Sequence, residues 1–280
     1  MDVLVGKLAG LLLDIWPYAV CFTAIALATK RARIVEAIRR SSGEATTNAL
    51  LLIFNALILV PLFVAPVTAL EHWLGQYRLV SEDSWAALPG LLTVVLAILA
   101  IDFVAYWRHR FEHAGPIWRF HATHHADTAI QWLSVQRKHP IARLMSLFAD
   151  LTLVWLIGVP VWAIFAAALI RGWWGYFIHA DVPWTLGPLG KALISPAAHR
   201  LHHIRDEQLM GHNFGNTFTL WDRLFGTYLD PAPYVDCETG IAEGTRGFFG
   251  ELARPFEARY HWRRKTAPAP AEAEPEEAPA

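Results

Sequence analysis

Long apolar runs limit what this 280-residue chain can fold into. Three of them, Leu8 to Thr29, Asn48 to Leu70 and Leu88 to Trp107, each supply about the twenty residues that a helix needs to cross a bilayer. A fourth run, Ile141 to Ile178, is too long for one straight span, and Gly158-Val-Pro160 interrupts it, so we expect a helical hairpin there. The runs predict an all-α integral membrane protein with about four to five membrane helices.

Two clusters of basic residues indicate which ends of the apolar runs lie in the cytoplasm. One cluster follows the first run and the other ends the third, whereas the loop before Ser84 has few cations. Because cytoplasmic loops carry an excess of Lys and Arg, the clusters predict one orientation, with the N-terminus outside. The clusters are Lys30, Arg31, Arg33, Arg39 and Arg40, and then Arg108 and Arg110. We expect an integral protein of the inner or cell membrane.

Charge and composition argue against nucleic acid as a partner and indicate how the chain is divided into regions. The net charge is only −1, so no broad basic surface for nucleic acid is expected. We predict N-terminal membrane helices and an outer loop over 1–87, a catalytic region over 88–230 and a cytoplasmic C-terminal segment over 231–265. Residues 266–280 are rich in Pro, Ala and Glu and are predicted to be a disordered tail.

Histidines recur at helical spacing near the cytoplasmic ends of these helices. Residues i, i+3 and i+4 of a helix share one face, so three short segments each present several imidazoles together. The eight clustered residues are His109, His113, His121, His124, His125, His199, His202 and His203. His179 ends the apolar hairpin, which would return it to the same place. The pattern predicts a cytoplasmic helical cap that carries a histidine-rich dimetal site on the cytoplasmic face.

The number of imidazoles indicates which metal they bind. Eight or more exceed what one four-coordinate zinc ion can use, and they suit two ions with several nitrogens each. We expect two iron ions with O2 as co-substrate, because oxidation of inert lipid C–H bonds needs a redox-active metal. No catalytic residue beyond the ligands is predicted. Further candidates for ligands, or for groups that orient ligands, are His139, His212, Asp102, Asp222 and Asn213.

The ordered motifs between Ile101 and Tyr228 resemble the membrane-bound fatty acid hydroxylase superfamily, in its sterol desaturase-like branch. They are Asp102-Phe-Val-Ala-Tyr-Trp-Arg-His109, His-x-x-x-His, His-x-x-His-His, Arg137-Lys-His-Pro140, Phe177-Ile-His179, Ser195-Pro-Ala-Ala-His-Arg-Leu-His-His203, Asn213-Phe-Gly215 and Trp221-Asp-Arg-Leu-Phe-Gly-Thr227. The chain departs from the family pattern at Ile141-Ala142 and at His212.

The resemblance implies a non-haem di-iron enzyme of lipid biosynthesis that hydroxylates or desaturates a lipid with O2 and external electrons. It places iron ligands on the eight clustered histidines and on His179. The sequence contains no haem-binding His-Pro-Gly-Gly signature, so we expect a separate electron donor, such as a cytochrome b5-like protein, a ferredoxin or a reductase.

Two other interpretations remain open from the sequence. His109-Arg-Phe-Glu112-His113 matches the His-x-x-Glu-His pattern of a zinc metallopeptidase, although that enzyme would leave six clustered histidines unused. A non-enzymatic histidine-rich metal transporter or haem-binding membrane protein is the second, but transport sites usually lie at mid-membrane. Two irons per chain would favour the oxygenase, and one zinc the peptidase.

Overall fold

The computed structural model describes residues 2–258, which form helices joined by loops. The predicted tail, 266–280, lies outside the described residues. The α-helices are α1 Asp2–Lys30, α2 Ile34–Phe54, α3 Val60–Gly75, α4 Glu82–Ala86, α5 Gly90–Glu112, α6 Gly115–His125, α7 Pro140–Ala149, α8 Thr152–Leu156, α9 Val161–Ile178, α10 Pro196–His202, α11 Leu220–Leu224 and α12 Phe248–Ala253. The described residues contain two isolated β-bridges and no longer strand, which confirms the predicted all-α fold.

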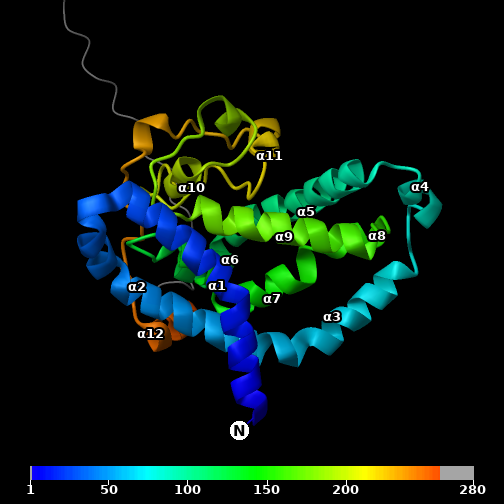
Figure 1. The fold of residues 1–280 in the computed structure, drawn as a ribbon, viewed down its shortest axis with the longest axis horizontal. Helices are drawn as coiled ribbons and strands as arrows, with labels where there is room; N and C mark the ends of the chain where they lie inside the picture. Colours follow the sequence, from blue (N-terminus) through cyan, green and yellow to red (C-terminus); the bar gives the residue numbers. More distant parts are fainter. Residues whose placement is uncertain (1, 259–280) are drawn as a thin grey trace, which may run out of the picture.

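The first two predicted spans belong to one long helical stretch, 5–75, that is apolar enough to cross a membrane. The 3-10 turn Arg31–Arg33 separates α1 from α2, and a π-helical turn, Asn55–Leu59, joins α2 to α3 (Figure 1). The helix that contains the second predicted span begins well before that span, because α2 starts at Ile34 and passes through Thr46 and Thr47. Both threonine hydroxyls donate to backbone carbonyls one turn earlier in the same helix.

The third span and the second arm of the hairpin are the helices α5 and α9, which pack side by side (Figure 1). The predicted break is confirmed, since α8 ends at Leu156 and α9 begins at Val161. Gly158 has φ +65°, and a Cβ there would lie 2.9 Å from the carbonyl oxygen of Val80. The first arm is divided into the ten-residue α7 and the five-residue α8, so it is shorter than a membrane span.

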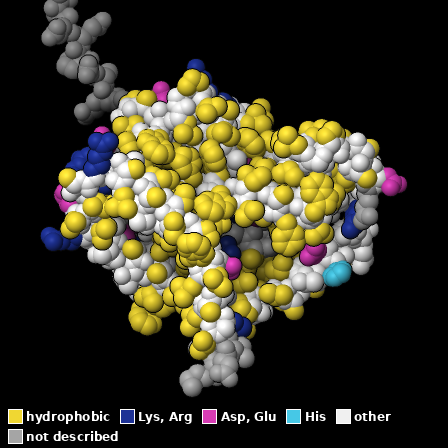
Figure 2. Space-filling model, viewed as in Figure 1, with side chains coloured by type: hydrophobic (Ala, Val, Ile, Leu, Met, Phe, Trp, Pro, Cys, Tyr) yellow, Lys and Arg dark blue, Asp and Glu magenta, His cyan; other side chains and the backbone are white. Residues whose placement is uncertain are grey.

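Apolar side chains occupy both the interior and the exterior of the helical bundle. One core lies between α3, α5, α8 and α9 and includes Ile101, Val154 and Ala167. Outside, many apolar side chains are exposed (Figure 2). On the spans, the Leu91 side chain is 80% exposed and the Phe165 side chain is 73% exposed. Exposed apolar surface of this kind is what a lipid-facing helix needs. These features support a membrane protein.

The cap is built from α6, α10, α11 and the loops around them, at one end of α5 and α9 (Figure 1). Ser195 accepts a hydrogen bond from the backbone N–H of Ala198 and caps α10. The backbone N–H of Ile194 donates to the carbonyl of Thr217, 2.9 Å away, which fastens α10 to the loop that follows it. The predicted helix around the second histidine motif is thus present.

Candidate metal centre

The structure brings all nine predicted histidines into two adjacent groups. Within each group, one ring nitrogen of every member lies within 4.8 Å of those of the other members. Group A contains His109, His113, His121, His125 and His202, and group B contains His124, His179, His199 and His203. The rings of His125 and His203 stack across the boundary with centroids 4.3 Å apart. The arrangement therefore offers two neighbouring metal sites.

The two His-x-x-His-His motifs each contribute to both groups, in an exchanged pattern. In α6 the first and last histidines of the motif belong to group A and the middle one, His124, belongs to group B. In α10 the first and last belong to group B and the middle one, His202, belongs to group A. The i, i+4 pair of α5 completes group A, and His179, at the C-terminus of α9, completes group B.

The inward ring nitrogens are spaced as ligands of a metal ion are. In group A, Nε2 of His121 lies 3.1 Å from Nε2 of His109 and 3.1 Å from Nε2 of His125. In group B, Nε2 of His199 lies 2.9 Å from Nε2 of His179 and 3.2 Å from Nε2 of His203. Two nitrogens bound at right angles to one ion at about 2.1 Å would lie about 3.0 Å apart. The observed spacing fits that geometry.

The outward ring nitrogens of five histidines face acceptors. Because a carbonyl or carboxylate oxygen only accepts hydrogen bonds, each of these Nδ1 atoms carries the proton, and Nε2 is left with a lone pair. The acceptors are the carbonyls of Phe214 for His109 (2.9 Å), Arg137 for His124 (3.2 Å), Gly175 for His179 (2.7 Å) and His212 for His202 (2.8 Å), and the Glu112 carboxylate for His121 (3.2 Å).

These tautomers leave lone pairs that need a cation. Nε2 of His109 and Nε2 of His121 face each other at 3.1 Å, and those of His124 and His179 at 3.5 Å, with no proton available for either pair. Nε2 of His202 is buried and has no hydrogen-bond partner among the described residues. Unpaired buried acceptors are costly. The chemistry of both groups therefore fits bound metal ions.

Burial also keeps the imidazoles in the neutral form that binds metal. Burial lowers the pKa of His179 and His202 to about 3, so these rings stay neutral at physiological pH. Burial, together with neighbouring imidazoles, also lowers well below the usual value the pKa of His124, His125, His199 and His203. Nine imidazole donors without a carboxylate among them suit a transition metal rather than Mg²⁺ or Ca²⁺.

The carboxylate of Glu112 contacts His121 of group A, and Glu112 was not among the orienting groups predicted from the sequence. One oxygen accepts from Nδ1 of His121, and the other accepts from Arg108, 2.8 Å away. The i, i+4 spacing of Arg108 and Glu112 was the available signal. Because both oxygens are occupied on the outer side of the ring, Glu112 orients a ligand and does not face a metal-bound water. This placement does not support the metallopeptidase interpretation.

Replacing Glu112 by Gln is expected to weaken metal binding in group A about 10- to 100-fold, the usual effect of losing a group that orients a ligand. Metal titration of the purified protein in detergent would measure this. The Arg223→Gln variant, in which the altered side chain lies on the surface of α11, should bind metal as the wild type does. Wild-type affinity in Glu112→Gln would contradict the assigned role.

Asp222 supports group A through the backbone. Its carboxylate accepts from the N–H groups of Phe214 and Gly215, at 2.7 and 2.8 Å, and from the Thr227 hydroxyl. Burial raises the pKa of this carboxyl to about 6. Phe214 in turn offers its carbonyl to His109. A Cβ on Gly215 would lie 2.9 Å from the Asp222 carboxylate, so glycine permits this close approach.

The remaining candidates lie outside both groups. Asp102 accepts from Arg171 and from the backbone N–H groups of Thr217 and Phe218. His139 caps α7, since its Nδ1 accepts from the N–H of Ile141. Asn213, at φ +55°, exchanges hydrogen bonds with the backbone of Leu229.

His212 contributes its backbone carbonyl to His202, and its own ring donates to the carbonyl of Leu209. It therefore acts through its main chain and not through its imidazole.

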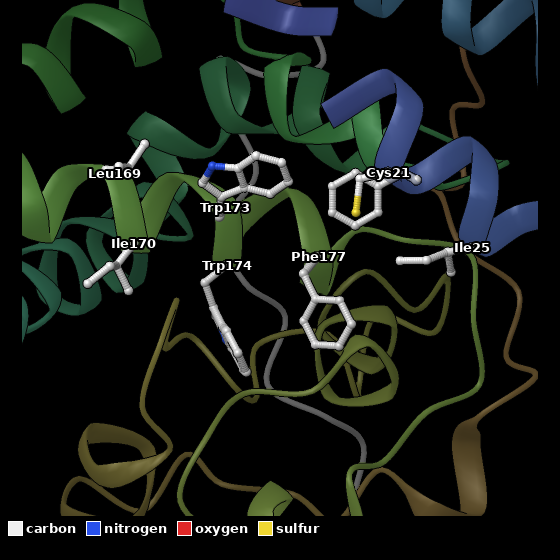
Figure 3. Close-up of a pocket in the computed structure, with 8 residues that line it drawn as sticks. Cys21, Ile25, Leu169, Ile170, Trp173, Trp174 and Phe177 are labelled. Atoms are coloured by element: carbon white, nitrogen blue, oxygen red, sulfur yellow. The ribbon is translucent and has the colours of Figure 1, made fainter. Parts of the chain in front are cut away.

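An apolar pocket of about 440 Å³ lies between α1 and α9 (Figure 3). Part of its lining comes from α1 and includes Cys21, and this was not predicted from the sequence. On α9, Trp173 and Phe177 line it. Gly175 and His179 follow these residues by two positions, which places them about 200° around the helix. The pocket therefore lies on the face of α9 that is turned away from the metal centre.

The comparisons with known proteins agree with this site. The family model for fatty acid hydroxylases matches residues 94–227, which contain all nine histidines. An ornithine lipid hydroxylase of Rhizobium tropici is 29% identical over 69% of this chain and 58% of its own length. An alkylglycerol monooxygenase of Xenopus tropicalis is 32% identical over 55% of this chain and 34% of its own length. A cholesterol 25-hydroxylase of Mus musculus is 29% identical over 64% of this chain and 60% of its own length.

The chain thus spans from about a third to three fifths of the length of these relatives. No solved structure gives a significant match. The family match and the sequence motifs cover nearly the same residues, and the fold brings the histidines of these motifs to one place. Over residues 94–227, this chain is therefore similar to the fatty acid hydroxylase family.

Proposed function

We propose that this protein is a membrane-bound non-haem di-iron oxygenase that uses O2 and external electrons to hydroxylate or desaturate a lipid C–H bond. The observation that carries the proposal is the pair of adjacent histidine groups with inward-facing neutral nitrogens. The family and the names of the three relatives support a lipid as substrate. Bound iron would supply the activation of O2 and the oxidation of the C–H bond.

The chain's own residues hold and orient this centre. Group A and group B provide the nitrogen ligands, and the backbone carbonyls with Glu112 hold the protons on the outward nitrogens. The burial of the ligands excludes bulk water from the inward side of both groups.

We place the centre on the cytoplasmic face of the inner or cell membrane. The basic residues that end α1 and α5 support this orientation, and Lys30 lies 2.7 Å from Asp181, two residues beyond His179. A separate electron donor, such as a cytochrome b5-like protein, a ferredoxin or a reductase, would then approach from the cytoplasm.

Metal analysis combined with product analysis tests the proposal. The purified protein should contain two irons per chain. With a reductant system, a lipid extract should yield a product whose mass increases by one ¹⁸O atom under ¹⁸O2 or decreases by two hydrogens. Ornithine lipids, alkylglycerols and sterols form the first substrate panel, as the names of the relatives suggest. One zinc per chain with peptide hydrolysis, or metal transport without lipid oxidation, would overturn the proposal.

A further inference from the structure

Arg137 is a fully buried arginine, at 0% exposed, that lies directly behind group B. Its guanidinium donates to a carboxylate, an amide, a hydroxyl, a second carboxylate and a backbone carbonyl, so each of its three nitrogens is hydrogen-bonded. These partners are Glu44 (2.7 Å), Asn48 (3.1 Å), Thr245 (2.8 Å), Glu251 (2.8 Å) and the carbonyl of Thr123 (2.8 Å). An arginine held from so many sides has a fixed position.

Arg137 forms hydrogen bonds to two consecutive residues of α6. Its side chain donates to the carbonyl of Thr123, and its own backbone carbonyl accepts the Nδ1 proton of His124, 3.2 Å away. That second contact turns Nε2 of His124 toward His179 in group B. The position of the Arg137 carbonyl therefore sets the direction of one ligand.

The two carboxylates that hold Arg137 come from opposite ends of the chain. Glu44 lies in α2 and Glu251 in α12, two helices that pack against each other (Figure 1). Both carboxylates are buried, and both lie outside the family match over 94–227. Glu44 also accepts from the Thr128 hydroxyl at 2.7 Å, just beyond α6.

The charges of this cluster balance. Glu251 also pairs with the buried Arg254, so two arginines face two glutamates, Glu44 and Glu251. Burying four charges is costly unless their geometry is tightly defined, and removing one partner disturbs the others.

We infer that Glu44 and Glu251 are positioning residues for group B, acting through Arg137 on His124. The inference rests on the proposed dimetal centre. It assigns to α2 and α12, which lie outside the matched region, a part in holding one of the two metal ions. The contacts that orient His121 and His109 of group A come from Glu112 and Phe214, which are not part of this cluster.

The test uses the full chain in detergent, with titration of Fe²⁺ under anaerobic conditions. Glu44→Gln and Glu251→Gln keep the side-chain shape and remove the charge. Each should weaken one of the two metal sites about 10- to 100-fold and leave the other unchanged. Leu51→Ala is the control, because it removes a fully buried apolar side chain from the same helix without touching Arg137.

Double variants identify the weakened site. At limiting Fe²⁺, Glu44→Gln combined with His124→Ala should still bind one ion, because both changes affect group B. Glu44→Gln combined with His113→Ala should bind none, because group A is then lost as well. The reverse result would overturn the inference.

Two other results bear on the outcome. Unchanged Fe²⁺ affinity in both glutamine variants, or an equal loss in Leu51→Ala, would overturn the inference and leave the proposed function standing. A wild-type chain that binds no Fe²⁺ would overturn both. Loss of one site only in the glutamine variants, with two intact sites in Leu51→Ala, would support the positioning role.

Discussion

Replacement of either His124 or His202 by alanine is expected to abolish lipid oxidation while leaving the protein inserted in the membrane. His124 belongs to group B and His202 to group A, so each variant damages a different metal site. We expect activity to fall by more than about 100-fold, since the loss of a direct ligand should exceed the loss of a group that merely orients one. Product formation and metal content, measured on the same detergent-purified samples, check this.

His72→Ala is the matched control for both variants. This histidine lies exposed in the last turn of α3 and belongs to neither group. The control variant should keep its metal and its activity. Full activity in His124→Ala or in His202→Ala would refute the assignment of two required metal sites.

Arg171→Met is expected to destabilise the protein by about 3–5 kcal/mol, the usual result of leaving a buried charge without its partner. Asp102 in α5 is 0% exposed, and Arg171 in α9 lies 3.2 Å from it. Without Arg171, only the N–H groups of Thr217 and Phe218 would face the carboxylate. Denaturant unfolding in mixed micelles, followed by tryptophan fluorescence, measures the change.

The double variant Asp102→Asn with Arg171→Met separates charge from packing. It removes the unpaired charge, so it should recover part of the stability that Arg171→Met loses. If Asp102→Asn lowers the free energy of unfolding in the Arg171→Met background as much as it does in the wild type, the two changes are additive. The loss of the ion pair would then not explain the destabilisation by Arg171→Met.

The ligand groups could be predicted from the sequence because they depend on local spacing. Histidines at i, i+3 and i+4 share a helix face, and that rule selected eight of the nine group members. His179 followed from the end of the apolar hairpin. The break at Gly158 was equally local, since glycine and proline interrupt helices wherever they occur together.

The supporting contacts could not be predicted because their partners lie far apart in the chain. Glu44 and Arg137 are separated by 93 residues, and Arg137 and Glu251 by 114. Long-range contacts also explain why α2 begins at Ile34, well before the apolar run that starts at Asn48. Glu44 and Asn48 are buried within this helix, and their hydrogen bonds to Arg137 and Asp127 satisfy their polar groups there.

The acidic candidates show the same limit. Asp102 and Asp222 were chosen as groups that orient histidines, and both instead accept from backbone N–H groups of the loop over 214–218. Spacing along α5 places Asp102 near the face of His109, but only the tertiary structure shows which donor reaches it. Glu112 does contact a ligand, but its i, i+4 spacing to Arg108 is also common among surface ion pairs, so that spacing alone does not show that it orients His121.

Each His-x-x-His-His motif supplies histidines to both group A and group B, and this limits insertions and deletions within the motifs. Each of α6 and α10 presents ligands to both groups from one turn of helix. Inserting or deleting a single residue inside either motif would rotate everything beyond it by about 100°. Because neighbouring histidines face different groups, that one event would remove ligands from both metals at once. The turns that carry the motifs therefore cannot change in length without loss of ligands from both groups.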